Sequence, residues 1–240
     1  MACHFARWRV TESEPDTHRL PADVLTFANT LAPKLRQRFI HGRVLLAELM
    51  FYLFGMTQLP QIIILPSGRP SFAASGLPDF SLAYASSTLG VMLSIEGKAG
   101  LDLEILHARS ALHQTRQVAF SAVEKTWIAV QADPDESASQ LECIRQSVHK
   151  LSGQTDITAD TLSLHPLSGR LRSSITQNVQ VMSNIEGSII WSCAHSPAFQ
   201  RLICWHYHPE EGFVRAQTFS SQQQVDSLHF MKLTSLPPAK

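Results

Sequence analysis

The sequence predicts an α+β fold, because helical and strand-like segments are mixed along it without a regular β-α-β alternation. Residues 31–54 follow a helical period, with Leu35, Phe39 and Val44 on one apolar face. Residues 162–208 follow strand periods almost throughout. The 240 residues are enough to bury a sizeable core in one large domain or in two small ones.

Three further strand patterns precede the long run of strands. Residues 61–65 are β-rich and end at Pro66-Ser67-Gly68. Residues 80–94 are typical of a hairpin that turns at Ser86–Ser87, and residues 99–106 alternate as a single strand.

Two more helices are predicted from a helical period, at residues 115–130 and 139–151. Two polar segments are predicted to lack regular structure. They are a loop at residues 132–138 and a loosely packed tail at residues 220–240.

The charge balance argues against one class of partner. Lys and Arg together number 20, and so do Asp and Glu, so the formal net charge is zero. A nucleic-acid-binding protein normally carries a basic excess. We therefore expect no nucleic-acid partner, and any anionic ligand must be held by a local basic patch.

Cysteine usage and the apolar segments predict a cytoplasmic protein without membrane contact. The N-terminal ten residues carry charges and lack the apolar region of a signal peptide. The longest apolar patch, residues 45–56, is interrupted by Glu48 and is too short to span a bilayer. The cysteines are scattered without a C-x-x-C pair, which favours a reducing compartment: Cys3, Cys143, Cys193 and Cys204.

The most informative motif is Gly100-Leu101-Asp102-Leu103-Glu104, on a predicted strand. Successive side chains of a strand point to opposite faces, so Asp102 and Glu104 share one face. Two carboxylates placed in this way can bind a hard cation, and Mg²⁺ takes a few carboxylates together with water and substrate phosphates. The alternative is a solvated strand face, which is the commoner meaning of an isolated D-x-E.

A second candidate lies on the helix predicted after residue 139. Glu142, Gln146 and Lys150 follow one another at four-residue spacing and form a polar stripe. Such a stripe could complete a metal and phosphate site, although it is more often the wet side of an amphipathic helix. The apolar side of the same helix consists of Leu141, Ile144, Val148 and Leu151.

Basic residues precede both candidates. Arg36, Arg38 and Arg43 lie on the helix predicted over residues 31–54, and Arg69 lies in the turn Ser67-Gly68-Arg69-Pro70. The guanidinium fork suits phosphate oxygens. For each residue taken singly, surface solubility is the plainer explanation.

Two other groups of residues could form a site of a different kind, a zinc site or the active site of a serine hydrolase. In a strand, Cys204, His206 and His208 would share a face and could bind Zn²⁺, but the sequence offers no obvious fourth ligand. Ser192 and Ser196 lie near His195, but neither stands in the G-x-S-x-G turn of a hydrolase.

Taken in order, six segments resemble the motifs of the 4'-phosphopantetheinyl transferases of the type that activates surfactin and enterobactin synthetases. Residues 100–104 match the Gly-x-Asp-x-Glu motif fully, and residues 120–124 match Phe-Ser-x-x-Glu fully. Order and spacing over roughly residues 30–155 are more specific than any single motif. The segments that match in part are residues 38–43, 68–70, 80–85 and 142–150.

The resemblance implies an enzyme that transfers the 4'-phosphopantetheine group of coenzyme A to a serine of an apo acyl or peptidyl carrier protein, with Mg²⁺ as cofactor. In that reaction a deprotonated serine attacks the β-phosphate of coenzyme A, and 3',5'-ADP leaves. Such enzymes act mainly by positioning the reactants and neutralising charge. Fatty-acid or polyketide biosynthesis is the implied setting.

The resemblance assigns a role to each residue that occupies a motif position. Asp102 and Glu104 would hold the metal, with Gln146 in the third place. Lys150, Gln146 and Glu142 would form the catalytic set. The residues expected to contact coenzyme A are Arg38, Arg43, Arg69, Tyr84 and Lys150.

Several positions depart from the family pattern, among them Arg145 in place of a Lys and Ala83 and Ala85 in place of serines. Two further departures affect the site most. Gln146 replaces a Glu, and its amide oxygen can bind a metal but brings no negative charge. Tyr84 replaces a His. We hypothesise that Glu142, one helical turn before Gln146, supplies the missing charge to the metal site. The alternative is that Glu142 occupies a solvent-facing position where the family has a Trp.

These departures leave two functions open. The changes at Gln146 and Tyr84 favour a catalytically impaired pseudoenzyme that binds coenzyme A or a carrier protein without turnover. The retained Asp102, Glu104 and Lys150 favour an active transferase of reduced activity.

The resemblance also implies an architecture. Two similar α+β halves, residues 1–110 and 111–240, would pack as an intramolecular pseudo-dimer. The coenzyme site would lie in the cleft between the halves, so that the protein can act as a monomer.

Overall fold

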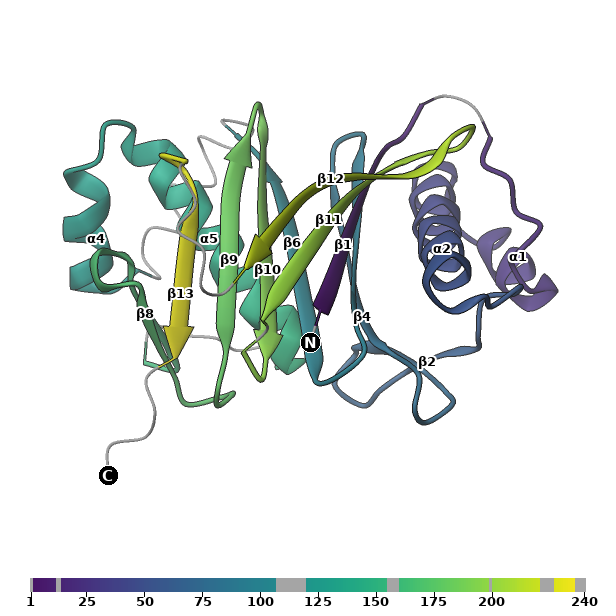
Figure 1. Ribbon diagram of the computed structural model, residues 1–240, viewed down its shortest axis with the longest axis horizontal. Coiled ribbons are helices and arrows are strands. Elements are labelled where there is room, and N and C mark those ends of the chain that lie inside the picture. The colour runs from purple at the N-terminus through teal and green to yellow at the C-terminus, as the bar shows by residue number, and fades with distance from the viewer. Residues whose placement is uncertain are drawn as a thin grey trace.

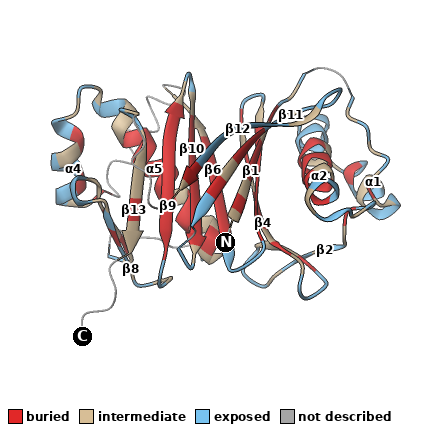
Figure 2. Cartoon of the chain, in the orientation of Figure 1, coloured by how far each residue is buried: buried red, intermediate tan, exposed pale blue. Residues whose placement is uncertain are grey.

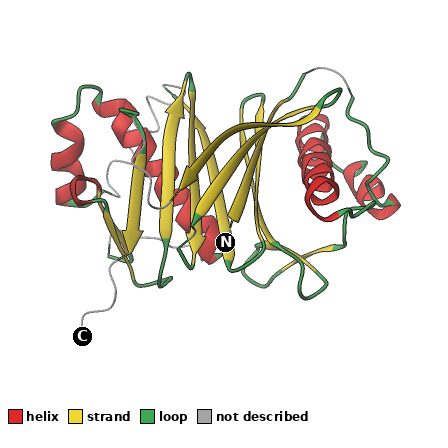
Figure 3. Cartoon of the chain, in the orientation of Figure 1, coloured by secondary structure: helices red, strands yellow, loops and turns green. Residues whose placement is uncertain are grey.

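The structure of the protein, a computed structural model, describes residues 2–11, 14–106, 120–154, 160–198, 200–220 and 227–235. Two large β-sheets occupy the middle of the molecule, and the helices lie against them and at the two ends (Figures 1 and 3). This mixture of sheets and helices confirms the predicted α+β class.

The first sheet has five strands in the order β12-β11-β1-β5-β4. Only β1 and β11 pair in parallel, and the other neighbours are antiparallel. The predicted hairpin at residues 80–94 is therefore correct, with its turn at Ser86–Ser87. The strands are β1 (Ala2–Arg9), β4 (Asp79–Ala85), β5 (Thr88–Ser94), β11 (Arg201–His208) and β12 (Gly212–Ser220).

The second sheet has six strands in the order β6-β10-β9-β13-β8-β7. Strands β2 (Ile62–Ile64) and β3 (Pro70–Phe72) form a separate two-stranded antiparallel sheet. The six strands are β6 (Lys98–Ile105), β7 (Leu162–His165), β8 (Arg170–Ser173), β9 (Gln180–Glu186), β10 (Ile189–Ser196) and β13 (Met231–Ser235), and a 3₁₀ turn, η2 (Pro166–Ser168), follows β7.

Helices α1 (Ala22–Ala28) and α2 (Pro33–Phe54) pack beside the first sheet (Figure 1). The ring of Pro33 fixes φ at a value that suits the first turn of a helix, where α2 begins. Gly55 ends the helix with φ of +70°. Leu45, Leu46 and Leu49 are fully buried against the sheet. The helix predicted over residues 31–54 is thus confirmed almost to the residue.

Helix α5 (Pro134–Ser152) crosses β6, β10 and β9 of the second sheet, with α4 (Ala122–Ala129) beside it. The predicted loop at residues 132–138 is wrong, because α5 already begins at Pro134. The Asp133 carboxylate accepts from the Glu136 N–H at 2.9 Å and so caps this polar first turn. Only the later part of the helix predicted at residues 115–130 is observed, as α4, and residues 115–119 lie outside the described residues.

The predicted polar tail at residues 220–240 is also wrong in part. Residues 231–235 form β13, which lies between β9 and β8, and Leu233 is fully buried. This strand is polar at most positions, so its partners, which lie far away in the sequence, determine its structure. Residues 221–226 and 236–240 lie outside the described residues.

Buried residues, red in Figure 2, gather on the strands of both sheets and on the helices that face them. Three large hydrophobic clusters and one small cluster around Cys143, Ile185 and Ile190 are found among the described residues. Of the three large clusters, one lies between α2 and the first sheet, and another lies between α5 and the second sheet. The third contains Phe5 and Met92 from the first sheet together with Leu101 and Trp191 from the second. The two sheets therefore pack on each other as well as on their helices.

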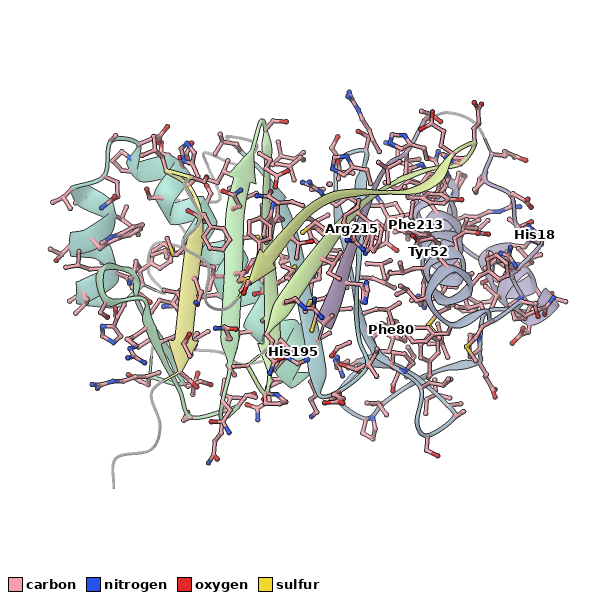
Figure 4. The ribbon with its side chains drawn as sticks, viewed as in Figure 1. His18, Tyr52, Phe80, His195, Phe213 and Arg215 are labelled. Atoms are coloured by element: carbon pink, nitrogen blue, oxygen red, sulfur yellow. The ribbon has the colours of Figure 1, made fainter. Side chains whose placement is uncertain are left out.

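The hairpin of β11 and β12 reaches across toward α2 (Figure 1). Its aromatic side chains meet α2 at Tyr52, whose ring lies 5.2 Å from that of Phe213 and 5.3 Å from that of Trp205. Arg215 lies over the Trp205 ring at 5.1 Å, so the cluster has a cation–π contact (Figure 4). The ring contacts of Tyr52 therefore tie the β11–β12 hairpin to α2, and the Arg215–Trp205 contact lies within the hairpin itself.

Each sheet takes strands from both sides of residue 110. Strand β6 belongs to the second sheet, whereas β11 and β12 belong to the first. The expected division between residues 110 and 111 lies outside the described residues. No helix in the described ranges is both long and apolar enough to cross a membrane.

Candidate active site

The centre of the candidate site is the contact between β6 and α5. A Cβ atom at Gly100 would lie 2.0 Å from the carbonyl oxygen of Ser147 and 2.6 Å from Leu151 Cβ. The helix can approach the strand this closely only because residue 100 is glycine. The motif glycine thus brings α5 against the strand that carries Asp102 and Glu104.

The two predicted faces of β6 are observed. Leu101 and Leu103 enter the core between the sheets, while Asp102 faces α5. Lys150 Nζ lies 2.7 Å from Asp102 Oδ1 and 3.4 Å from the carbonyl oxygen of Leu82. The structure therefore unites the acidic motif with the last residue of the predicted helical stripe.

Asp102 is an unusual carboxylate. Burial raises its pKa above the ordinary range, and the Lys150 ammonium opposes that shift. Its second oxygen, Oδ2, is buried without a hydrogen bond of ordinary length among the described residues, but the Cys143 thiol and the Leu103 N–H lie close enough to the carboxylate to lower its pKa. A buried carboxylate oxygen of this kind normally has a donor or a cation beside it.

Cys143 of α5 lies near both carboxylates of the motif. Burial raises the pKa of its thiol well above the ordinary value, and the nearby Asp102 and Glu104 carboxylates raise it further. Its Sγ lies 3.9 Å from the carbonyl oxygen of Ile190. The thiol is therefore protonated, and it acts as a small buried side chain rather than as a nucleophile.

The other two residues of the predicted stripe contact each other. Gln146 Nε2 donates to Glu142 Oε1 at 2.8 Å. Glu142 is buried, with 7% of its surface exposed, which does not support the alternative that it faces solvent. This hydrogen bond uses the Nε2 group of the Gln146 amide, so Oε1 is the atom of that amide that could bind a cation.

The residues that the resemblance assigned to a cation are two carboxylates and one neutral amide. In the part of the chain that the structure describes, no group of three or more His, Cys, Asp or Glu side chains is placed to hold a metal. Asp102 and Glu104 supply two carboxylates, and the third donor of this set is the Gln146 amide. Asp102 Oδ2, which accepts no hydrogen bond of ordinary length from the described residues, is the oxygen that a cation could contact.

A cavity of about 250 Å³ opens beside Lys150. Lys150 and His149 line it from α5, and Ser81 and Leu82 line it from β4. His149 was not predicted as a site residue, although it precedes Lys150 in the helix. The remaining lining residues are Ser67, Gly68, Arg69, Pro70, Phe80 and Gly153.

A second hollow, of about 450 Å³, lies further along β4. Lys34, Arg38 and His41 line it from α2, and Tyr84 lines it from β4. Tyr84 is two residues beyond Leu82, so these two lining residues are about 7 Å apart along the strand. We call this second opening the basic hollow.

Tyr84 occupies the space above Gly42. A Cβ atom at Gly42 would lie 2.1 Å from the Tyr84 hydroxyl oxygen, so the tyrosine ring packs where α2 has no side chain. Burial raises the pKa of Tyr84, while the neighbouring Arg43 and Arg38 oppose the shift. Arg43 lies over the Phe39 ring at 4.9 Å, and burial lowers its pKa. Of the arginines predicted on α2, Arg38 lines the basic hollow.

Arg69 has a different environment from the one expected for a phosphate ligand. Both of its terminal nitrogens bond to the Asp79 carboxylate, and its Nε donates to the carbonyl oxygen of Lys150 at 3.0 Å. Only 9% of the side chain is exposed. Asp79 lies outside every motif, and the sequence carries no signal that it pairs with Arg69.

The Phe-Ser-x-x-Glu motif builds structure rather than the site. Ser121 and Glu124 cap α4 reciprocally, at 3.3 Å and 2.7 Å. Glu124 also accepts from Arg145 at 2.5 and 2.6 Å and from the Leu164 N–H at 2.8 Å. The motif therefore joins α4, α5 and β7 through one buried carboxylate.

The alternative sites weighed from sequence are not supported. Cys204 is buried in the core between the sheets, and His206 Nε2 lies 3.0 Å from Arg7 Nη2. Among the described residues no group of three or more metal-ligating side chains is placed to hold an ion, so the zinc hypothesis gains no support. His195 is fully buried at the end of β10 (Figure 4), where its Nε2 lies 2.6 Å from Ser94 Oγ. Ser192 bonds instead to Ser147, and Ser196 bonds to the Gln177 carbonyl oxygen.

Comparison with known proteins finds relatives at two levels of similarity, whereas no protein-family model matches. The uncharacterized protein YieE of Escherichia coli K12 is 36% identical over 246 residues, which covers all of this chain and 98% of YieE. The 4'-phosphopantetheinyl transferases AcpT of Salmonella typhimurium LT2 and of E. coli K12 are 29% and 30% identical over 89 residues. Those matches cover 37% of this chain and 43% of each AcpT.

Proposed function

We propose that this chain, which belongs to the family of the uncharacterized protein YieE, is a 4'-phosphopantetheinyl transferase. It would transfer phosphopantetheine from coenzyme A to a serine of an apo carrier protein. The observation that carries the proposal is the Lys150–Asp102 pair, 2.7 Å apart, at a cavity next to the basic hollow. The partial similarity to AcpT supports the same activity.

The two openings suit the two ends of coenzyme A. Its nucleotide end carries phosphates, and Lys34 and Arg38 in the basic hollow offer an ammonium and a guanidinium to them. The cavity beside Lys150 would then receive the pyrophosphate and the start of the pantetheine arm. An extended ligand could lie along β4 from Tyr84 to Leu82 and reach both openings.

The chemical step needs charge neutralisation more than covalent catalysis. The serine hydroxyl loses its proton to water, its oxygen forms a bond to the β-phosphorus, the bond from that phosphorus to the bridging oxygen breaks, and 3',5'-ADP leaves with that oxygen. Lys150 would hold the phosphate oxygens, and Asp102 would fix the direction of its ammonium. A Mg²⁺ ion held by Asp102, Glu104 and the Gln146 amide would neutralise pyrophosphate charge when bound.

A second candidate function is a binding protein without turnover for coenzyme A or a carrier protein. Gln146 lacks a negative charge, and its amide donates to Glu142. Arg69 is occupied by Asp79, and Tyr84 fills the space beside Gly42. These observations favour reduced catalysis. The basic hollow and the cavity beside Lys150 still offer basic side chains that could bind the phosphates of coenzyme A.

Intact-mass analysis separates the two functions. Several apo carrier proteins are incubated with this protein, coenzyme A and Mg²⁺, and the gain of one phosphopantetheine is measured. The transferase predicts a gain that disappears in Asp102→Ala and persists in Glu211→Gln, whose side chain is exposed in a turn. Coenzyme A binding without any mass gain would support the binding protein, and the absence of both would exclude the two proposals.

A further inference from the structure

Arg69 forms a junction between three elements. Its Nη1 donates to Asp79 Oδ1 at 3.0 Å, and its Nη2 donates to the second Asp79 oxygen and to the Ala99 carbonyl oxygen at 2.8 Å. With Nε bonded to the Lys150 carbonyl oxygen, most of the five donors of the guanidinium are in use. Little of the fork remains to bind a ligand phosphate.

Asp79 extends this junction. The oxygen that accepts from Arg69 Nη2 also accepts from the Ala99 N–H at 2.7 Å. Asp79 belongs to β4 of the first sheet and Ala99 to β6 of the second. The Arg69–Asp79 pair therefore fixes the two sheets to each other next to the strand that carries Asp102.

The contact with Lys150 is a helix cap. The last four carbonyl groups of an α-helix lack partners within it, and Lys150 lies in the last turn of α5. Arg69 Nε gives its carbonyl oxygen a donor and places a positive charge at the negative end of the helix dipole. A Cβ atom at Gly153, where α5 ends, would lie 2.9 Å from Ser67 Oγ, so the turn that carries Arg69 packs directly on this helix end.

We infer that Arg69 is a positioning residue that acts through Lys150, and the inference rests on the proposed transferase function. The carbonyl group that Arg69 holds and the ammonium that contacts Asp102 belong to the same residue. Arg69 thus sets the position of the Lys150 backbone, and through it the position of Nζ relative to Asp102 and the substrate phosphate. A displacement of about 1 Å at such a group can lower a rate by about 100-fold.

The first test is the kinetics of Arg69→Lys. Lysine keeps the positive charge, but its single ammonium cannot reach Asp79, Ala99 and Lys150 together. We expect kcat to fall about 10- to 100-fold, with little change in KM for coenzyme A. Arg38→Lys, in the basic hollow, is the matched control and should mainly raise KM. A rise in KM with unchanged kcat for Arg69→Lys would identify a phosphate ligand and overturn the inference.

A double-mutant cycle with Lys150 tests whether Arg69 acts through that residue. If it does, Arg69→Lys should lower the rate of Lys150→Ala by less than about twofold. A loss as large as the loss in the parent protein would show an independent role and overturn the inference. Thermal denaturation of all four proteins shows whether the folded state is retained.

Hydrogen exchange separates a failure of this inference from a failure of the proposed function, because it needs no activity. Arg69→Lys should speed exchange at the amides of residues 149–153 by about tenfold and leave those of residues 138–144 unchanged. Asp79→Asn should have the same pattern. Unchanged exchange at the helix end would overturn the positioning role even in an inactive protein. A parent protein that transfers nothing would instead refute the proposed function alone.

Discussion

Arg145 Nη2 lies 2.5 and 2.6 Å from the two carboxylate oxygens of Glu124, and both side chains are buried. Arg145 also donates to the Leu162 carbonyl oxygen at 2.9 Å. The pair therefore holds α4, α5 and β7 together at one point. Breaking a buried pair leaves an uncompensated charge, which costs more than the pair contributes to stability.

Glu124→Gln should accordingly lower the free energy of unfolding by about 3 kcal/mol, because Arg145 keeps its charge without a counterion. Urea denaturation followed by circular dichroism measures this difference. Glu96→Gln is the matched control, since the Glu96 side chain is exposed, and it should change stability by less than about 0.5 kcal/mol. Equal midpoints for the two variants would contradict a structural role for the Phe-Ser-x-x-Glu motif.

Gly100→Ala should both destabilise the protein and lower the transfer rate, because a methyl group 2.0 Å from the Ser147 carbonyl oxygen forces α5 away from β6. Overpacking of this kind costs about 1–3 kcal/mol. Gly212→Ala is a useful comparison, since its φ of +78° strains alanine although nothing lies within 4 Å of the added atom. It should cost about 1 kcal/mol and leave the transfer rate unchanged. An unchanged rate in Gly100→Ala would mean that the strand–helix distance does not matter for catalysis.

Asp102→Asn should be relatively more stable at neutral pH than at low pH. The pKa of Asp102 is raised in the folded state, so its ionised form is disfavoured there compared with the unfolded chain. Stability contributed by this group is present below the ordinary carboxyl value of 3.8 and is lost as the pH rises through the raised pKa. The variant lacks this loss. The free energy of unfolding of the variant minus that of the parent should therefore increase as the pH rises over that window. Parallel stability curves from pH 3 to 7 would contradict the raised pKa.

His4 should contribute the opposite pH dependence. Burial, assisted by Arg215, lowers its pKa from 6.5 to about 4, and its Nδ1 accepts from the Trp205 indole N–H at 3.1 Å. The unfolded chain binds a proton more readily in this range, so the stability contributed by neutral His4 is lost as the pH falls from 6.5 through about 4. His4→Asn retains an acceptor but does not titrate. Its denaturation midpoint should therefore fall less between pH 6.5 and 4 than that of the parent, and an equal fall would exclude His4 as the cause.

Local periodicity predicted the parts of the fold that depend on nearby residues. Helix α2 and the β4–β5 hairpin have repeating patterns, and the apolar face of α5 is buried as predicted from its spacing. The wrong predictions have identifiable causes. The start of α5 is polar and depends on an Asp133 cap, and β13 is fixed by strands that lie far from it in the sequence.

The candidate site could be predicted from sequence to a similar extent. The motif residues Asp102 and Lys150 are in contact. Each lies in an element that its local pattern predicts, Asp102 in an alternating strand and Lys150 in an amphipathic helix. The environment of Arg69 could not be foreseen, because three of its acceptors are backbone carbonyl oxygens, which any residue type supplies. Glu142 was assigned to the site from its spacing alone, and the spacing could not show that it is buried and accepts a hydrogen bond from Gln146.

The pairing of β1 with β11 has a consequence for synthesis of the chain. Ala2 pairs with Arg201, and β1 lies between β5 and β11 in the first sheet. During translation one edge of β1 thus stays open until residues 201–208 leave the ribosome. An open strand edge can pair with other chains, and contacts between distant segments form slowly. The first sheet can therefore be completed only after residues 201–208 have been synthesised, and until then β1 can pair on one side alone.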